Sequence, residues 1–409
     1  MRRFLEPLVR PSAAAFLLMF TLDTMARAIL VTVIPLQAYA LLADVQKVSV
    51  LYFAASAAGL CGGLTVPWLV QKLHRRGTLA LGTGCLALSV LLFSLERFWA
   101  LAPGLVLQMF GGAAITICLN LFVLDNIPKS ALTRFEPRRM FLAGIGWIAG
   151  PVLGVYLATR VAPWLPFLLS GGISFLLLTY LQLIGVPRAL ANGNAARAGA
   201  NPTRFVRRFF AQPRLALAWL LSVGRAAWWN MFYIYTPIFA VTTGLGEEAG
   251  GVISSIGSVG LFTVTFWGWV GRRNGIRWLL ILGYVATAVA TALVGITMAW
   301  PILSAALLVV AAFAASITDG AGNVPFLRAV HVYERTEMTS VYSTYRETAR
   351  LAMPATNSVL LLVFPLSAVF IASAAMMFAL TQFARYIPHR FGRERPPADQ
   401  AAGADSSHK

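Results

Sequence analysis

The sequence has very little charge for its length. Charged residues make up 12% of its 409 positions and apolar residues 58%, whereas soluble domains carry about 25% charged residues. A soluble protein this poor in charge has too few polar side chains to cover its surface. The apolar residues also form blocks of about twenty or more, which is longer than a soluble core helix needs. These blocks predict membrane-spanning helices.

Motifs for several kinds of catalysis are missing. The chain has no Gly-x-x-x-x-Gly-Lys-Ser/Thr phosphate loop, which argues against direct use of ATP. Its four histidines are scattered, and they form no metal-binding or catalytic cluster with acids or thiols. Cys61, Cys85 and Cys118 lie in apolar blocks without metal-ligand spacing, which is typical of packing. We therefore expect no enzyme activity, no cofactor and no metal.

The net charge is +18, from 33 basic and 15 acidic residues. Placement of the charges argues against a nucleic-acid partner. Four basic residues lie inside apolar blocks and three in one set of connections, while the other 26 lie in the termini and alternate loops. This asymmetry is the positive-inside signature of a membrane protein. The charge therefore indicates membrane topology.

The apolar blocks predict an all-α membrane protein with twelve transmembrane helices. Each block can cross about 30 Å of hydrocarbon as a helix. The spans are expected near residues 13–42, 48–71, 78–95, 99–124, 140–160, 164–186, 215–243, 249–270, 277–299, 301–327, 340–364 and 366–387. Basic residues cluster at both termini and between spans 2 and 3, 4 and 5, and 8 and 9, so both termini should be cytoplasmic.

One long connection divides the spans into two sets of six. Residues 1–186 and 215–387 are the predicted six-helix halves, 187–214 is a cytoplasmic linker, and 388–409 is a tail expected to be disordered. The linker ends in the cluster Arg204–Phe210. A short amphipathic segment on the inner membrane surface and a solvated basic linker both fit this composition.

Landmarks recur between the two halves. Asp23 and Arg225 each precede a proline by twelve positions, and a pair of arginines follows at the end of the next span. A second proline lies 116 residues after the first in one half and 117 residues after it in the other. The shared offsets predict two parallel repeats of six helices.

With these features, residues 13–387 resemble the major facilitator superfamily. The segment 67–76 is similar to the family's loop between spans 2 and 3, with Gln71 where the family has Asp and His74 where it has Gly. The segment 146–154 is similar to the Gly-Pro motif of antiporter-like bacterial members. The arginine that the family carries in span 4 is absent beside Gly111 and Gly112, which argues against proton antiport through that position.

Span 5 carries a stripe of small residues. Gly146, Gly150 and Gly154 lie at i, i+4 and i+8 on one helix face, where another helix can pack closely. Pro151 removes a backbone donor and permits a bend. Plain helix packing and a gating role for Gly150 and Pro151 both remain open.

Four charges inside spans are candidates for a transport site. A charge within the bilayer costs about 2.5–3.5 kcal/mol on insertion scales, so each one needs a reason. Asp23 and Arg27 are i, i+4 and can pair. Arg225 lies at the matching depth in span 7, and Asp319 lies in span 10. The resemblance implies that spans 1, 4, 7 and 10 line a central cavity, so we prefer a solute site to purely structural ion pairs.

Polar and aromatic neighbours extend this site. Trp229 and Tyr233 share a face that can stack on a planar solute, although aromatic residues at helical spacing are more often packing. Asn323 follows Asp319 by one helical turn. The candidate solute-binding residues are Asp23, Arg27, Arg225, Trp229, Tyr233, Asp319 and Asn323. Asp23 is the candidate proton carrier, with Asp319 as the alternative.

Further charges are candidates for gates. The pairs Arg75–Arg76 and Arg272–Arg273 occupy matching loops, and we expect them either to bond helix ends across the cytoplasmic face or only to set orientation. Early in span 11, the residues that can line the inner cavity or pair across the halves are Arg346, Glu347 and Arg350. We prefer the gate.

The sequence therefore predicts a secondary active transporter in the inner cell membrane, working as a monomer by alternating access. Its expected partners are a small organic solute, protons and the lipid bilayer. Two arginines beside aromatic residues favour an amphipathic anion or zwitterion, and the Gly-Pro motif favours efflux. An uptake permease is the alternative within transport. A channel would need a repeated pore ring, and a membrane-embedded enzyme would need clustered catalytic groups.

Overall fold

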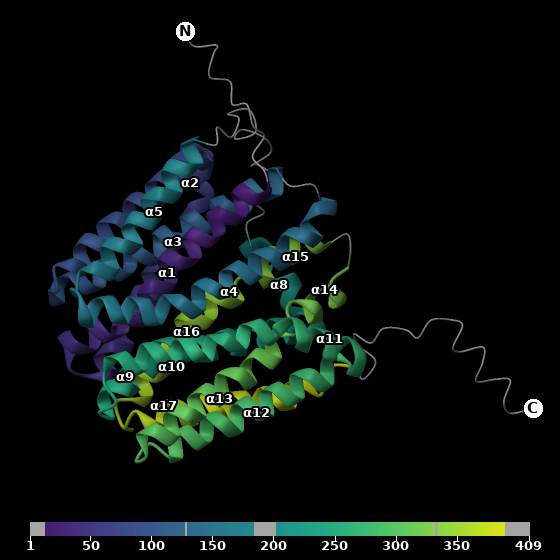
Figure 1. Ribbon diagram of the computed structural model, residues 1–409. Helices are drawn as coiled ribbons and strands as arrows, with labels where there is room; N and C mark the ends of the chain where they lie inside the picture. Colours follow the sequence, from purple (N-terminus) through teal and green to yellow (C-terminus); the bar gives the residue numbers. More distant parts are fainter. Residues whose placement is uncertain (1–12, 127–128, 184–201, 332–333, 389–409) are drawn as a thin grey trace, which may run out of the picture.

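A computed structural model describes residues 13–126, 129–183, 202–331 and 334–388 of the chain. All regular elements within these ranges are helical, and the helices form two groups (Figure 1). The N-terminal half contains α1 (Ala13–Leu42), α2 (Val45–Ser94), α3 (Phe98–Asn126), α4 (Lys129–Arg160) and α5 (Leu165–Leu183).

The second group begins with a short linker helix, α8 (Pro202–Phe210). The C-terminal half then contains α9 (Pro213–Thr242), α10 (Glu247–Val259), the 3₁₀ helix η1 (Gly260–Thr263), α11 (Val264–Asn274), α12 (Ile276–Ile296), α13 (Pro301–Asp319), α14 (Val324–Ala329), α15 (Arg335–Tyr342), α16 (Tyr345–Leu360) and α17 (Ser367–Ala384).

Eight helical stretches of the described residues are long and apolar enough to cross a bilayer. The predicted spans in α5, α9 and α16 coincide with helices that fall outside this set, and α16 has only 16 residues. The observed helices thus begin and end close to the predicted spans. A count of twelve crossings and the side on which the termini lie remain predictions.

Helix α2 joins two predicted spans. At about 1.5 Å per residue, its 50 residues would reach roughly 75 Å, more than twice the hydrocarbon thickness. It is broken at His74, whose φ of 59° and ψ of 170° are not helical. The break lies between the predicted spans 48–71 and 78–95, so the chain reverses there by a single kinked residue.

Three spans predicted as continuous are interrupted, including 340–364, where α15 ends at Tyr342 and α16 begins at Tyr345. The span predicted at 301–327 is present as one apolar stretch, Pro301–Ala329, but its helix is interrupted. Helix α13 ends at Asp319 and α14 begins at Val324, with Gly322 at a φ of +51° between them. The span 249–270 contains the 3₁₀ helix η1 between α10 and α11. Gly322 tolerates its positive φ because glycine has no Cβ, whereas Gly260 at the start of η1 has an ordinary helical φ of −52°.

The end of the predicted linker is helical and docked on the protein. Phe209 of α8 is fully buried, in a cluster with Leu215 and Met338. Arg208 forms an ion pair with Glu334, which also accepts a hydrogen bond from Gln212 at 3.1 Å. Helix α8 therefore packs on α9 and α15 instead of lying free in solvent. Residues 187–201 of the predicted linker and the predicted tail from 389 lie outside the described residues.

Contacts between the halves come in matched pairs. Helix α4 runs along α10 and α16 packs on α2, while within the halves α4 packs on α1 and α16 on α9 (Figure 1). Exchanging the halves converts each of these contacts into its counterpart, as the predicted repeat requires.

The apolar core is distributed unevenly along the bundle. We call the end where α1 begins and α17 ends the tail side, and the opposite end the far side. One cluster contains residues of both halves, including Val33, Tyr52 and Tyr235. Towards the tail side the N-terminal half has its own cluster around Phe16 and Phe122. The C-terminal half has a separate one around Phe209 and Tyr342.

Large apolar side chains also cover the outside of the bundle. Phe175 of α5 is 64% exposed, Val310 of α13 is 55% exposed and Phe378 of α17 is 57% exposed. Such a surface is unfavourable in water and suits contact with lipid tails.

Candidate functional site

An ion pair lies inside the N-terminal half. The Asp23 side chain is 3% exposed and accepts a hydrogen bond from the guanidinium of Arg27 one turn later in α1. Arg27 remains 33% exposed, and a Cβ added to Gly112 of α3 would lie 3.8 Å from its Cδ. The pair predicted from i, i+4 spacing is therefore formed, with the carboxylate buried and the cation facing outward.

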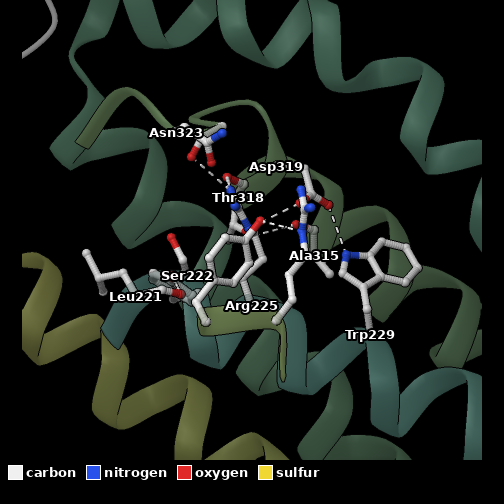
Figure 2. A network of polar contacts seen from close by, with 12 residues as sticks. Leu221, Ser222, Arg225, Trp229, Ala315, Thr318, Asp319 and Asn323 are labelled. Atoms are coloured by element: carbon white, nitrogen blue, oxygen red, sulfur yellow. Dashed lines mark hydrogen bonds and ion pairs between the residues drawn. The ribbon is translucent and has the colours of Figure 1, made fainter. Parts of the chain in front are cut away.

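A second ion pair lies where α13 breaks (Figure 2). Arg225 Nε lies 3.3 Å from Asp319 Oδ1, and Arg225 Nη1 donates to the carbonyl oxygens of Thr318 and Gly322 at 3.3 and 3.1 Å. The end of a helix leaves carbonyls without partners, and in a membrane no water replaces them. Arg225 donates to two carbonyls at this end, one of which, Thr318, also accepts from the Ala321 amide at 3.2 Å, and it places a cation at the negative end of the helix.

A line of aromatic rings connects α13 to the other half. Trp229 Nε1 donates to Asp319 Oδ2 at 2.9 Å, and its ring stacks on Tyr233 with centroids 5.7 Å apart. Tyr233 bonds Ser258 of α10 at 2.8 Å, and its ring lies 5.0 Å from that of Trp147 in α4. Since α4 belongs to the N-terminal half, Trp147 and Tyr233 bridge the two halves.

The two ion pairs are linked through this bridge. Gly146, next to Trp147, packs against Thr24, which follows Asp23 in α1. The predicted arrangement of solute between Asp23–Arg27 and Arg225–Asp319 thus has an aromatic wall on one side. Sequence reasoning missed Trp147. Its position directly after a glycine of the span 5 stripe was the signal that could have found it.

Asn323 lies at the same helix break but points away from the ion pair. It precedes α14, its side chain is exposed, and its Oδ1 accepts a hydrogen bond from Tyr342 at 3.3 Å (Figure 2). The Tyr342 hydroxyl also lies 2.7 Å from that of Ser222 in α9. Tyr342 and Ser222, which carried no sequence signal, therefore hold the segment that follows Asp319.

The predicted gating arginines of the two halves differ. Arg75 is 2% exposed and donates to the carbonyl oxygen of Leu121 in α3 at 3.2 Å, within its own half. Arg76 is half-buried. Arg272 and Arg273 are exposed, and Arg273 lies over the ring of Trp269 at 4.7 Å. The matching loops hence have unequal surroundings, and their gating role stays a prediction.

The charges at the start of α16 interact locally. Glu347 pairs with Arg350 at 3.1 Å on its own helix, and both are about 40% exposed, at 41% and 42%. Arg346 Nε bonds the Tyr345 hydroxyl at 3.0 Å. These interactions of Arg346, Glu347 and Arg350 stay within α16, and a gate that pairs across the halves stays a prediction.

The glycine stripe of α4 packs against α1. A Cβ at Gly150 would lie 2.5 Å from Ala28 Cβ, and one at Gly154 would lie 2.0 Å from the carbonyl oxygen of Ile29. The carbonyl of Pro151 accepts a hydrogen bond from Thr32 at 3.3 Å. The expected close packing is present, and whether Gly150 and Pro151 also act as a gate is untested.

Far-side polar contacts join the halves as well. The Ser49 hydroxyl of α2 lies 2.7 Å from that of Tyr235 in α9. Arg160, at the end of α4, donates to both carboxylate oxygens of Glu248 in α10, at 2.5 and 3.2 Å. Together with the shared apolar cluster, these contacts join the halves on the far side.

The family model described as Major Facilitator Superfamily matches residues 16–350. The chain belongs to this superfamily. Major facilitator proteins are multi-pass membrane transporters, so the protein is a transporter rather than an enzyme. Among the described residues, no group of three His, Cys, Asp or Glu side chains can hold a metal ion.

Solved structures of the superfamily share the fold at low identity. The nucleoside transporter NupG has a TM-score of 0.73 and 15% identity, covering 91% of this chain and 99% of its own. A POT family transporter in complex with 5-aminolevulinic acid has a TM-score of 0.71 and 11% identity, covering 90% and 94%. A D-xylose-proton symporter has a TM-score of 0.67 and 14% identity, covering 94% and 98%. No curated protein matches the sequence.

Proposed function

We propose that the protein exports a small amphipathic organic anion or zwitterion across the inner membrane in exchange for protons, by alternating access between its halves. The observation that carries the proposal is the pair of ion pairs, one in each half, connected by the rings of Trp147, Tyr233 and Trp229. They offer charge and an apolar surface side by side near the middle of the bundle.

Alternating access is supported by the distribution of contacts. The halves share one apolar cluster with far-side polar bonds, while each half has a core of its own towards the tail side. Such a conformation is closed on the far side. Transport then requires a second conformation in which the far-side contacts of Ser49 and Arg160 separate.

The class of solute follows from the hydrogen-bond donors that each arginine still has available for a ligand. Arg225 is occupied by two carbonyls and a carboxylate, so it is mainly structural. Arg27 is one-third exposed and keeps donors for a solute carboxylate. The ring of Trp147 or Trp229 can stack on the apolar part of the same molecule.

Proton coupling is assigned to Asp23. In the described structure Asp23 bonds Arg27, whereas Asp319 accepts from both Arg225 and Trp229. Protonating Asp319 thus loses two charge-assisted bonds and protonating Asp23 loses one. A solute anion that draws Arg27 away from Asp23 favours protonation of that carboxyl, which couples the two ligands through differential affinity. The D-xylose-proton symporter shares the fold, and its printed name includes protons.

The test is Asp23→Asn, which imitates the protonated carboxyl. A thermal-shift screen of small organic anions and zwitterions against purified protein first identifies a bound probe. In proteoliposomes, the variant should exchange that probe between compartments at a near wild-type rate but should not concentrate it when a pH gradient is applied. Accumulation driven by the gradient in the variant rules out Asp23 as the coupling residue.

Asp44→Asn is the matched control. Asp44 caps α2 by accepting from the Gln46 amide at 2.8 Å, and asparagine caps helices equally well, so transport should be unchanged. Loss of all probe binding in Asp23→Asn would indicate that the carboxylate contacts the solute directly, as it would contact the cationic group of a zwitterion, and that Asp23 does not act only in coupling. Probe flow in the opposite direction under the same gradient would indicate an uptake permease.

A further inference from the structure

A narrow cleft opens on the tail side of the C-terminal half. Its volume is about 230 Å³, and it lies between the first turns of α9, helix α14 and the residues that follow α17. The walls are mainly apolar, formed by Leu217, Leu221, Pro325, Ala329 and Ile387. None of the ion-pair residues of the central site lines it.

One arginine lines this cleft and another bonds its wall. Arg214, in the first turn of α9, is exposed and lines the cleft itself. Arg277 of α12 donates to the carbonyl oxygen of Ile387 at 3.4 Å, which places its guanidinium beside the wall. Arg385 is exposed two residues before Ile387, and Tyr386 is 78% exposed. An apolar slot with a cationic and aromatic rim suits an amphiphile with an anionic head.

We propose that this cleft binds one anionic phospholipid of the tail-side leaflet. The cleft lies where the helices end, which is the depth of the lipid headgroups, and exposed tyrosine is typical of that layer. Arg214 and Arg277 bind the phosphate with their forked donors, and one acyl chain enters between Leu217 and Ala329. Basic pockets between transmembrane helices are a recurrent form of anionic lipid recognition.

The bound lipid also affects the central site. Pro325 and Ala329 belong to α14, which follows the broken end of α13, and Gly322 at that break accepts from Arg225. An acyl chain between α14 and α9 holds α14 in place and so fixes the carbonyls that Arg225 binds. Lipid occupancy therefore stabilises the helix break.

Titration of the purified full-length protein with phosphatidylglycerol or phosphatidylcholine tests the proposal, with thermal unfolding and native mass spectrometry as readouts. Phosphatidylglycerol should raise the Tm of the wild type and remain bound as one molecule, and phosphatidylcholine should do neither. Arg214→Gln with Arg277→Gln should weaken phosphatidylglycerol binding about tenfold or more. Ala329→Phe, which fills the slot and keeps the charges, should abolish retention.

The matched control is Arg207→Gln with Arg273→Gln, which removes the same charge from exposed arginines outside the cleft. It should bind phosphatidylglycerol as the wild type does. If the control and the cleft variant lose phosphatidylglycerol binding equally, the overall positive charge explains the binding, and the proposal is overturned. Retention of one phosphatidylglycerol by Ala329→Phe would overturn it too, and this variant decides the matter alone if the double arginine variant does not fold.

Discussion

Arg225 shares its guanidinium among two carbonyl oxygens and one carboxylate at the point where α13 ends. The helix break frees these carbonyls from regular helical bonding, although the Thr318 carbonyl still accepts from the Ala321 amide at 3.2 Å, and Asp319 adds a negative charge beside them. A planar guanidinium with five donors can satisfy such a set, whereas the ammonium of lysine is a compact point charge.

Arg225→Ala should therefore lower the free energy of unfolding by about 3 kcal/mol, since it leaves the Asp319 carboxylate, which is only 21% exposed, without its counterion. Arg225→Lys should recover only part of that loss. Denaturant unfolding in detergent, followed by circular dichroism, measures both. Arg273→Ala, at an exposed position, should change stability by less than about 0.5 kcal/mol. Equal stability of the alanine variant and the wild type would contradict the assigned role.

Of the two ion pairs, only the one between Asp23 and Arg27 could be predicted from the sequence as a direct contact. Asp23 and Arg27 are one turn apart, so helix geometry alone brings them together. Arg225 and Asp319 belong to different helices, and only their depth in matching spans indicated that they share a site. The role of Trp147 depended on its ring contact with Tyr233 of the other half, which no local pattern encodes.

Helices α1 and α4 approach closely along the glycine stripe. A Cβ at Gly154 would lie 2.0 Å from the carbonyl oxygen of Ile29, so any side chain there forces the helices apart. Gly154→Ala should cost about 1–3 kcal/mol through overpacking. Gly172→Ala in α5 meets no atom within 4 Å and should be neutral or slightly stabilising. Thermal unfolding of the two variants measures the contrast, and equal Tm values would argue against tight packing.

The linker helix α8 is fastened to α15 by Glu334. The pKa of the Glu334 carboxyl lies below its ordinary value, first because Gln212 donates a hydrogen bond to it and then because Arg208 does. We call the contact of Glu334 with Gln212 and Arg208 the clasp. Because the pKa of Glu334 is lowered in the folded state, the ionised carboxylate stabilises the clasp fully at pH values above the ordinary glutamate pKa. This stabilisation is lost as the pH falls through the lowered pKa. The clasp should be unchanged between about pH 5 and 8, well above the usual value of about 4.3.

Spin labels at Val206 and Thr339 report the α8–α15 distance by electron paramagnetic resonance. The distribution should stay narrow at neutral pH and broaden only under strongly acidic conditions. Glu334→Gln should broaden it at every pH, whereas Glu337→Gln should have little effect, because Glu337 is 39% exposed and its pair with Arg208 is 3.7 Å long. A narrow distribution in Glu334→Gln at all pH values would show that apolar packing of Phe209 suffices.

Helix boundaries were predictable where hydrophobicity changes sharply. The first span, predicted at 13–42, coincides with α1. The break after Asp319 was not predictable, because glycine is common in transmembrane helices and the block around Gly320 and Gly322 stays apolar. That interruption arises from tertiary bonds of Arg225 and Tyr342.

For the molecule as a whole, the positive-inside asymmetry predicts that residues 187–214 and both termini are cytoplasmic. Single cysteines at Asn192 and Gly246, in a background without Cys61, Cys85 and Cys118, should react with an impermeant reagent from opposite sides of the membrane. A cysteine at Gly246 would be strained, because this residue has a φ of +89°, so a cysteine at Glu247 can replace it as the second reporter. Reaction of both cysteines from outside the cell would contradict the predicted topology.

The ring contact between Trp147 and Tyr233 gives the transporter an optical signal of its own. The two rings belong to different halves and lie 5.0 Å apart, so movement of α4 relative to α9 changes the surroundings of one indole among eleven tryptophans. The difference spectrum between the wild type and Trp147→Phe isolates the emission of that indole. Its wavelength and quenching follow the separation of the halves during turnover, without any attached dye.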